Sequence, residues 1–229
     1  MGKIGKNSFD IQESNRVSVL RILSKEDVLT RADLSRMTGL KQATITNIIN
    51  DLLSSGVVSE TGTLKGNLGR RSIGIRLNAE NFNVVGIKIA RRSYSVGIFN
   101  IKNQLLDKTY QKLEPSTGAS AVLQSLVADA RRLIDKYGSC CAIGVAVPGP
   151  YLRREGRIAV MTEFVGWEKI DIYKKLSDAF EQPVFVEHDA NAGALGEWNC
   201  SANIGSDDVL VHLLASEGIG SGVVIDIAE

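Results

Sequence analysis

The sequence has 229 residues, of which 44% are hydrophobic and 23% charged, a composition typical of a soluble globular protein with one large or two smaller domains. It contains no apolar run long enough to span a bilayer and no apolar core behind Lys3 and Lys6, which argues against a membrane protein and predicts a cytoplasmic location. The net charge of +1 is divided unevenly, with +4 on residues 1–80 and −3 on the remainder, so the basic excess that nucleic-acid binding needs lies in the first part.

The first predicted helix covers residues 15–25. Its apolar side is expected to consist of Val17, Leu20, Ile22 and Leu23. Residues 1–10 are expected to be loose, and their lysines either touch a phosphate backbone or, as we favour, are simply solvated.

A second, short helix is predicted to begin at Thr30, because Thr30 and Asp33 have the T-x-x-D spacing of a capping box. Gly39 should end this helix, since glycine readily takes the left-handed backbone conformation found at helix C-termini. The buried side of the helix is expected to consist of Ala32, Leu34 and Met37.

Residues 41–54 predict a third helix with two distinct faces. Apolar residues recur at the spacing of one helical face, at Ile45, Ile48, Ile49, Leu52 and Leu53. The other face carries short hydrogen-bonding side chains and one cation, which can reach base edges and phosphates when a helix lies in a major groove. The DNA-binding candidates at this end of the helix are Lys41, Gln42, Ala43, Thr44, Thr46 and Asn47.

A basic hairpin is predicted to follow this helix. Residues 57–60 alternate weakly like a strand, and a turn is marked by Gly62, Gly66, Asn67 and Gly69. Residues 61–79 contain no acid and four cations, Lys65, Arg70, Arg71 and Arg76. We therefore predict a winged helix-turn-helix domain over residues 1–79, with Arg70 and Arg71 contacting DNA. The alternative is a three-helix protein-binding module with a solvated loop.

Residues 80–229 predict an α/β domain. Three strands joined by short polar turns, at 84–89, 94–99 and 105–113, should form an antiparallel meander. Helices and strands then alternate, which favours a layered domain whose sheet is mainly parallel on its far side. The helices are expected at 119–137, 171–180 and 191–200, and the strands at 142–147, 184–187 and 209–214.

The three cysteines, Cys140, Cys141 and Cys200, lack C-x-x-C spacing, and two of them introduce an apolar run. They are expected to be buried reduced thiols rather than metal ligands or a disulfide.

A series of motifs carries a family resemblance. The first part contains R-A-D-L-S-x-x-T-G-L and L-G-R-R-x-x-x-I-R-L-N. The second contains A-V-P-G-P, G-W, E-H-D-A-N-A-G-A-L-G-E and G-I-G-S-G, in that order. Together they resemble the ROK family of transcriptional repressors and sugar kinases. The resemblance implies a winged helix-turn-helix followed by a sugar-binding α/β domain of the actin-like, ribonuclease H-like ATPase fold.

The resemblance also assigns roles to residues. In the kinases of the family the aspartate of the D-A-N motif is the base, so Asp189 is a vestigial catalytic candidate, unless it merely caps a helix beginning at Asn191. Glu163 and His188 stand where the family has sugar-binding asparagines, and with Asp189 they are the sugar-binding candidates. The nucleotide-binding candidates Gly218, Gly220 and Gly222 resemble a second phosphate loop, but could equally form a plain hairpin turn.

The first phosphate loop of a family kinase reads D-x-G-G-T, whereas this sequence has Lys88, Ile89, Ala90, Arg91 and Arg92. Such a loop should not hold a nucleotide and its metal productively, so the chain is expected not to be an enzyme. A sugar kinase of the glucokinase or N-acetylglucosamine kinase type, carrying a DNA-binding extension, is the alternative.

The sequence therefore predicts a sugar-responsive repressor of carbohydrate uptake or catabolism genes. Its expected partners are double-stranded operator DNA, a small sugar and further copies of itself in a homodimer or higher oligomer. No cofactor is expected in these residues, because the structural zinc of the family requires a histidine and cysteine cluster beyond the second phosphate loop. The chain thus resembles a shortened family member that contains the first lobe and the start of the second.

Overall fold

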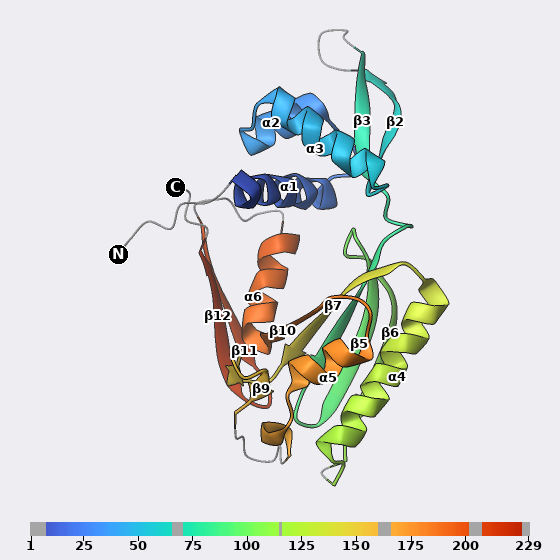
Figure 1. Ribbon diagram of the computed structural model, residues 1–229. Coiled ribbons are helices and arrows are strands. Elements are labelled where there is room, and N and C mark those ends of the chain that lie inside the picture. The colour runs from blue at the N-terminus through green and yellow to red at the C-terminus, as the bar shows by residue number, and fades with distance from the viewer. Residues whose placement is uncertain (1–7, 66–70, 115, 160–165, 202–207, 226–229) are drawn as a thin grey trace. The chain divides into compact units, whose positions relative to one another are not determined.

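The computed structural model describes residues 8–65, 71–114, 116–159, 166–201 and 208–225. The chain divides into two compact units, Met1–Asn81 and Phe82–Glu229, and each buries its own set of apolar side chains (Figure 1). The sequence placed the domain boundary after Ala79. Among the helices that the structure describes, none combines the length and the apolar character needed to cross a bilayer.

The first unit packs three helices against a small antiparallel sheet (Figure 1). The helices are α1 (Ser8–Lys25), α2 (Arg31–Thr38) and α3 (Gln42–Ser54). The strands, in sheet order, are β1 (Leu29–Thr30), β3 (Arg71–Leu77) and β2 (Val58–Lys65). Three helices followed by a hairpin form the winged helix-turn-helix that the sequence predicted.

α3 lies at the centre of this unit's core because its apolar residues share one face. The predicted stripe is confirmed, since Ile45, Ile48, Ile49 and Leu52 are all buried. Leu53, at the edge of the stripe, is only half-buried.

α1 differs from its prediction in length and in orientation. It begins at Ser8, so part of the segment expected to be loose is helical. Val19 and Leu23 are buried, whereas Val17 is 57% exposed. Val19 and Leu23 are one turn apart and share a face, while Val17 lies about 200° around the helix from Val19.

α2 has the predicted cap but not the predicted buried face. The Thr30 hydroxyl accepts the Asp33 N–H at 3.1 Å, and the Asp33 carboxylate accepts the Thr30 N–H at 3.2 Å, which completes a capping box. Gly39 ends the helix at φ 72°, as expected. Of the three residues expected to be buried, only Leu34 is, because a helix of about two turns offers its neighbours a narrow strip. The two exposed ones are Ala32 and Met37.

The second unit is built on a five-stranded sheet of order β10-β7-β4-β5-β6. These strands are β4 (Asn83–Ile89), β5 (Ser93–Asn100), β6 (Leu105–Lys112), β7 (Cys140–Val147) and β10 (Val184–His188). β4, β5 and β6 form the predicted antiparallel meander, and β10, β7 and β4 run parallel. The expected meander and parallel far side are therefore confirmed.

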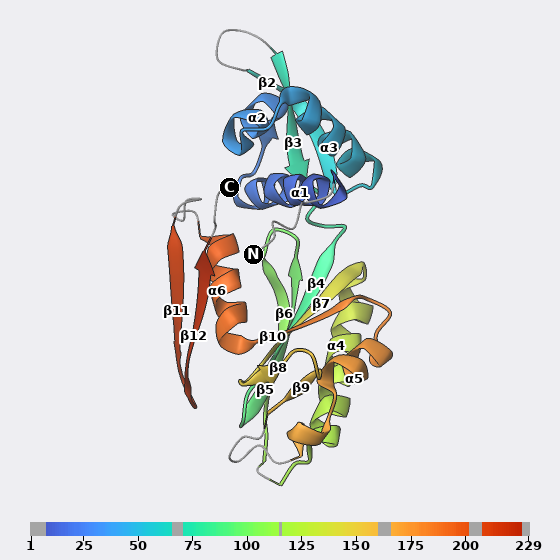
Figure 2. The ribbon, with the colours of Figure 1, turned by 60° about the vertical axis from the view of Figure 1, so that its left-hand side comes forward.

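Helices lie on both sides of this sheet (Figure 2). α4 (Ala119–Tyr137) and α5 (Ile172–Ala179) cover one face, where their apolar residues and those of β4, β5 and β7 form the main core. On the other side lie α6 (Asp189–Cys200) and a hairpin of β11 (Val209–Ala215) and β12 (Ile219–Ile225). α6 thus begins earlier than the sequence predicted.

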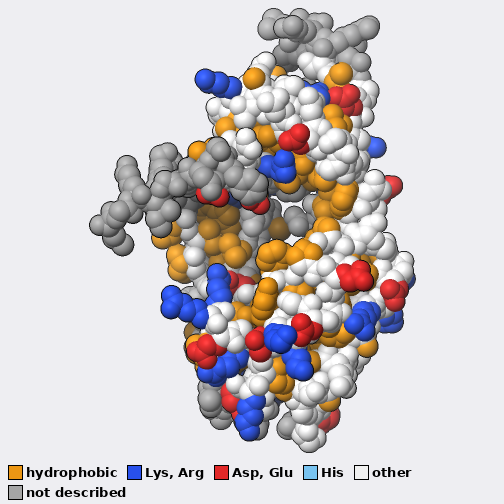
Figure 3. Space-filling model, in the orientation of Figure 1, with side chains coloured by type: hydrophobic (Ala, Val, Ile, Leu, Met, Phe, Trp, Pro, Cys, Tyr) orange, Lys and Arg blue, Asp and Glu red, His pale blue; other side chains and the backbone are white. Residues whose placement is uncertain are grey.

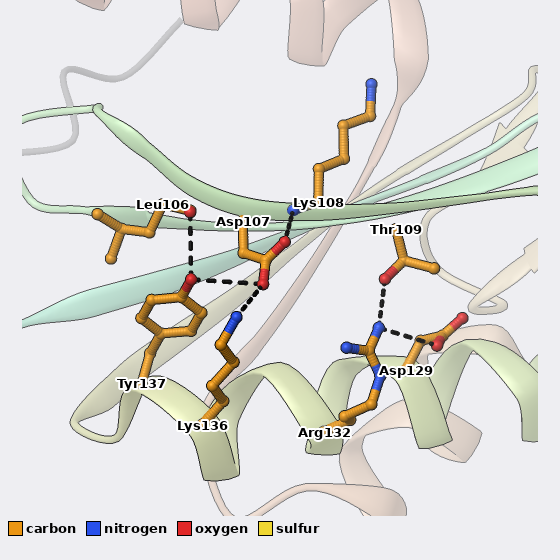
Figure 4. Close-up of polar contacts among 8 residues, drawn as sticks. All are labelled: Leu106, Asp107, Lys108, Thr109, Asp129, Arg132, Lys136 and Tyr137. Carbon is orange, nitrogen blue, oxygen red and sulfur yellow. Dashed lines mark hydrogen bonds and ion pairs between the residues drawn. The ribbon is translucent and has the colours of Figure 1, made fainter.

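Polar contacts join α4 to the edge strand β6 (Figure 4). They connect Arg132, Lys136 and Tyr137 of α4 to Asp107 and Thr109 of β6. The Lys136 ammonium lies 2.8 Å from the Asp107 carboxylate. Lys108, the next residue, extends away from α4 (Figure 4), because successive side chains of a strand point to opposite faces.

The β11–β12 hairpin packs closely on the first turn of α6. A β-carbon at Gly222 would collide with the backbone carbonyl of Ala190, so this approach requires glycine. Figure 3 shows hydrophobic side chains reaching the surface of the second unit above a band of mixed charges. The outward face of the hairpin exposes Val209, Val211, Leu213, Ile219, Val223 and Ile225.

Between β7 and α5 lie three short elements that the sequence did not predict. They are β8 (Tyr151–Leu152), β9 (Arg157–Ile158) and the 3₁₀ helix η1 (Trp167–Lys169). Elements of two or three residues have no periodicity to detect. Ile158 and Trp167 nevertheless contribute to the core.

The cysteines are free thiols, but they are not all buried as expected. Cys140 is half-buried, and burial raises the pKa of its thiol. Cys141 and Cys200 are exposed. Cys141 lies where the pairing of β7 with β4 shifts register, which interrupts the burial that the following apolar run suggested.

Candidate functional site

The N-terminal half of α3 presents a polar surface to solvent. Five of its six DNA-binding candidates are exposed, namely Lys41, Gln42, Ala43, Thr46 and Asn47, and Thr44 is half-buried. The Thr46 hydroxyl donates to the Gln42 carbonyl at 2.8 Å, so its proton is already used within the helix. Within the described residues, the side-chain amides of Gln42 and Asn47 have no such partner, and they can offer both donors and acceptors to an outside group.

The hairpin of β2 and β3 follows α3 and is linked to α2. Arg31 donates to the Glu60 carboxylate at 2.9 Å, which ties the helical part of the unit to the first strand of the hairpin. A bulge between Glu60 and Thr63 bends the hairpin beyond this point. Arg70 and the side chain of Arg71 lie outside the described residues, so their contacts with DNA stay a prediction.

In the second unit a cleft of about 460 Å³ opens at the carboxyl ends of the parallel strands. β4, β7 and β10 end there, which is where open α/β sheets commonly bind ligands. The cleft is lined by His188 and Asp189, by Lys88, Arg91 and Ser95, and by the turn between β11 and β12.

His188 and Asp189, two of the sugar-binding candidates, meet at the junction of β10 and α6. The Nε2 atom of His188 lies 3.2 Å from Oδ1 of Asp189, which also accepts the Ala190 N–H at 2.8 Å. His188 is the N-cap residue and Asp189 the first residue of α6, so Asp189 does not cap a helix beginning at Asn191. The third candidate, Glu163, lies outside the described residues.

The His188 side chain lines both the cleft and a second cavity of about 540 Å³. In this cavity Glu187 forms an ion pair with Arg153 and accepts a hydrogen bond from the Asn191 amide at 3.1 Å. A β-carbon at Gly149 would collide with the His188 imidazole, so Gly149 allows the ring its position. Arg153 was not predicted from the sequence, because it begins the turn after β8 and belongs to none of the recognised motifs.

The glycine-rich segment forms the hairpin that the sequence left open as an alternative. Gly220 and Gly222 lie in β12, opposite Leu214 and His212 of β11. Gly218 precedes the strand, and both Gly218 and Gly220 line the cleft, whereas Gly222 packs on α6. Nucleotide binding by these glycines stays a prediction.

The segment that replaces the first phosphate loop lies at the end of β4. Lys88 and Ile89 are the last residues of β4, and residues 90–92 form the turn that leads into β5. The Arg91 N–H donates to the Glu217 carboxylate at 2.9 Å across the cleft. Lys108 and Tyr110 of β6 line the same cleft. The sequence could not reveal them, because the pairing register of β5 and β6 decides which of their side chains reach it.

In the part of the chain that the structure describes, no cluster of three or more His, Cys, Asp or Glu side chains is placed to hold a metal ion. The two histidines and the described cysteines therefore do not fit the structural zinc of the family. That zinc stays an expectation for residues beyond the second phosphate loop.

Comparison with known families matches both units. Residues 84–228 match the family described as "ROK family", and residues 13–59 match the family described as "Winged helix-turn-helix DNA-binding". Among curated proteins, the xylose repressor of Bacillus subtilis is 28% identical over 94% of this chain and 56% of its own. The chain spans about half the length of the curated relatives it matches.

Solved structures show the same fold. A ROK family transcriptional regulator, described as a homologue of the Escherichia coli MLC protein, superposes with a TM-score of 0.72 at 22% identity, over 94% of this chain and 55% of that one. A ROK hexokinase from Thermus thermophilus superposes with a TM-score of 0.55 at 33% identity, over 63% of this chain and 47% of that one. The kinase-type match covers a share of the chain comparable to the second unit alone.

Proposed function

The chain belongs to the ROK family, and on this premise we propose that it is a sugar-responsive, DNA-binding repressor of genes for carbohydrate uptake or breakdown. The observation that carries the proposal is the exposed polar surface on the N-terminal half of α3, within a winged helix-turn-helix unit. Support comes from relatives that align with 94% of this chain and are named as repressors.

In this proposal α3 lies in the major groove of operator DNA. Gln42 and Asn47 read base edges, because a side-chain amide can donate to and accept from adenine at once. Lys41, Arg70 and Arg71 contact phosphates, which adds affinity without sequence preference. One winged unit covers one half-site, so the protein is expected to act as a homodimer or higher oligomer.

The effector sugar binds in the cleft of the second unit. Carboxylates accept hydrogen bonds from sugar hydroxyls and an imidazole can accept or donate them, which suits His188 and Asp189 of the cleft to this role. Glu163 stays a candidate on the family resemblance alone. His188 stands where the family kinases have an asparagine, so the pattern of donors and acceptors offered to the sugar differs from theirs. The proposal accordingly names a sugar without naming which one.

A sugar kinase is the second candidate, and the position of Asp189 in the cleft favours it. Against it stands the segment at the end of β4. Phosphoryl transfer needs the nucleotide phosphates held on backbone N–H groups beside a bound metal. Lys88 places a positive charge where the kinase motif has a carboxylate, and the Arg91 side chain lines the space that the phosphates would need. We propose that this segment does not support transfer.

The proposal is tested by selecting DNA from a random pool and footprinting the selected sequence. The protein is expected to protect two related half-sites spaced by about 34–36 Å or a multiple of it. One member of a panel of pentoses, hexoses and N-acetylated sugars should change the affinity measured by fluorescence anisotropy. Selection without any sequence preference, or full affinity for a lone half-site, would contradict the proposal.

A further inference from the structure

The cleft of the second unit is lined by more positive than negative side chains. Lys88 ends β4, Arg91 follows in the turn, and Lys108 comes from β6. In the described part of the chain, the side chains of these three cations form no ion pair with an acid. Three cations that line one cleft without acidic partners repel one another, so a ligand that neutralises them should be bound favourably.

The pairing of the strands places the two lysines on one face of the sheet. Lys88 lies opposite Ser95, and Lys108 lies opposite Gly97, two residues further along β5. Residues two apart in a strand face the same way, so Lys88 and Lys108 flank one stretch of β5 from both sides. Figure 4 shows Lys108 directed away from α4, towards the face that carries the cleft.

The floor between the two lysines suits a small anion. Ser95 lines the cleft beside Lys88, and its hydroxyl can donate a hydrogen bond. Lysine ammonium groups and hydroxyls are ordinary partners of phosphate oxygens.

Two carboxylates also line the cleft, and each is already engaged. Oδ1 of Asp189 accepts the Ala190 N–H and lies 3.2 Å from the His188 ring. The Glu217 carboxylate accepts the Arg91 N–H. These contacts reduce the repulsion that either carboxylate would exert on an anion.

The cleft continues into the second cavity, with which it shares Gly149, His188, Ile219 and Gly220. That cavity is lined by Asn191, Tyr151 and the Arg153–Glu187 ion pair, whose opposite charges cancel. Such groups can donate hydrogen bonds to sugar hydroxyls and accept hydrogen bonds from them. Volumes of about 460 and 540 Å³ lie in the usual range of small-molecule sites. A ligand with an anionic end and a polyhydroxy end fits this division.

We propose that the effector is a sugar phosphate, whose phosphate lies between Lys88 and Lys108 with Arg91 beside it, and whose ring extends past His188 towards Asn191. The inference deepens the proposed function, on which it rests for the sugar part. A free sugar would leave the cations without a partner. A nucleotide would offer its phosphates to the same cations, so ADP and ATP are compared directly with sugar phosphates.

The test is isothermal titration calorimetry of the protein with hexose and pentose phosphates, the matching unphosphorylated sugars, inorganic phosphate, and ADP or ATP without metal. Sugar phosphates are expected to bind at least 10-fold more tightly than the free sugars. Lys88→Ala and Lys108→Ala should each weaken that binding by about 10-fold or more, since charge-assisted hydrogen bonds are lost. The matched control is Lys175→Ala in α5, an exposed lysine that lines neither cavity.

Equal binding of free and phosphorylated sugars, or equal effects of all three lysine variants, would overturn the inference. So would a nucleotide that needs Lys88 and Lys108 while sugar phosphates fail to bind. Operator affinity measured without ligand should be the same for wild type and the Lys175→Ala control. If a free sugar alone releases operator DNA, the proposed function stands and the sugar phosphate inference fails; if no operator is bound, the proposed function fails independently.

Discussion

Among the residues that the structure describes, Tyr94 has the most strongly shifted pKa. It lies in β5 with 3% of its surface exposed, and its hydroxyl donates to the Asp129 carboxylate of α4 at 2.9 Å. Burial first, and then this carboxylate, raise the pKa of Tyr94 to about 12 from an ordinary value of 10.0. The folded protein therefore holds the phenol proton at a pH where an unfolded chain has lost it.

This pKa predicts how stability changes in alkali. The contribution of Tyr94 is complete below about pH 10 and is lost as the pH rises through about 12, because the unfolded state then binds fewer protons. Tyr94→Phe should lower the free energy of unfolding by about 1 kcal/mol at pH 8 and by less at pH 11. Urea unfolding at both pH values measures the difference, with the exposed Tyr173→Phe as the control. Parallel losses in wild type and Tyr94→Phe between these values would contradict the assignment.

Single residues were predictable only where their own neighbours in sequence decide their role. Thr30, Asp33 and Gly39 behave as expected, because a cap depends on residues three to five positions apart. The Tyr94 partner Asp129 and the cleft residue Lys108 were not foreseen, since both depend on which strand or helix packs beside which.

At the scale of elements, the cap of α2 should control the stability of the first unit. The Thr30 hydroxyl first, and then Arg36, hold the pKa of Asp33 below its ordinary value. A carboxyl group whose pKa is lowered by folding stabilises the folded state at pH values above about 4, its pKa in the unfolded chain. This contribution is lost as the pH falls through the lower pKa of the folded state. Thr30→Ala should cost about 1 kcal/mol.

The pH dependence separates the cap from general effects of substitution. Asp33→Asn should reduce the free energy of unfolding at pH 7, and the deficit should shrink as the pH is lowered past 4 in thermal or urea unfolding. Glu26→Gln, at an exposed position between α1 and β1, is the control that removes a charge without touching the cap. A deficit of Asp33→Asn that is the same at pH 3 and pH 7 would show that the carboxylate is not responsible.

α3 carries the element-scale prediction for DNA. Asn47→Ala is expected to cost about 1–3 kcal/mol on the selected operator and to relax its sequence preference. Ser54→Ala is the matched control, because it removes a small polar group from the last residue of the same helix. Anisotropy titrations on operator and on random DNA make the comparison. Equal losses of Asn47→Ala on both DNAs would assign the residue to the phosphate backbone instead.

The same helix shows which properties of a helix or strand can be predicted from the spacing of its apolar residues. The buried stripe of α3 was predictable because four of its apolar residues repeat with the helical period over 13 residues. α2 has 8 residues, too few for the period to distinguish Leu34 from Met37, and β8 and β9 have two each. Predictability therefore fell with the length of the element.

For the molecule as a whole, we expect no phosphoryl transfer from ATP to sugars. The reason is the positive charge of Lys88 and Arg91 beside the cleft, where a kinase needs a site for phosphates and metal. The assay should use the complete natural protein with Mg²⁺, ATP and a sugar panel. ADP release that depends on sugar and disappears in Asp189→Asn would establish a kinase and refute the expectation.

The family and the order of most of the longer elements were predictable from sequence, because each long element has its own periodicity and the motifs follow one another in a fixed order. The shape of the cleft was not. It depends on the register that sets Lys88 opposite Ser95 and on the close approach of Gly222 to Ala190, and both are contacts between distant parts of the chain. The E-H-D-A-N motif predicted only the cleft residues at the junction of β10 and α6. The cleft residues from β5 and β6 could be identified only from the folded structure.

The charged edge strand β6 has a consequence for the long-term behaviour of the protein in solution. A strand at the border of a sheet offers unpaired backbone groups that can recruit another chain and start a fibril. β6 has this position, but it carries Lys108 and Lys112, and the opposite edge, β10, has only 5 residues. Lysines and short borders both oppose the addition of strands. We therefore expect both borders of the five-stranded sheet to resist the addition of further strands.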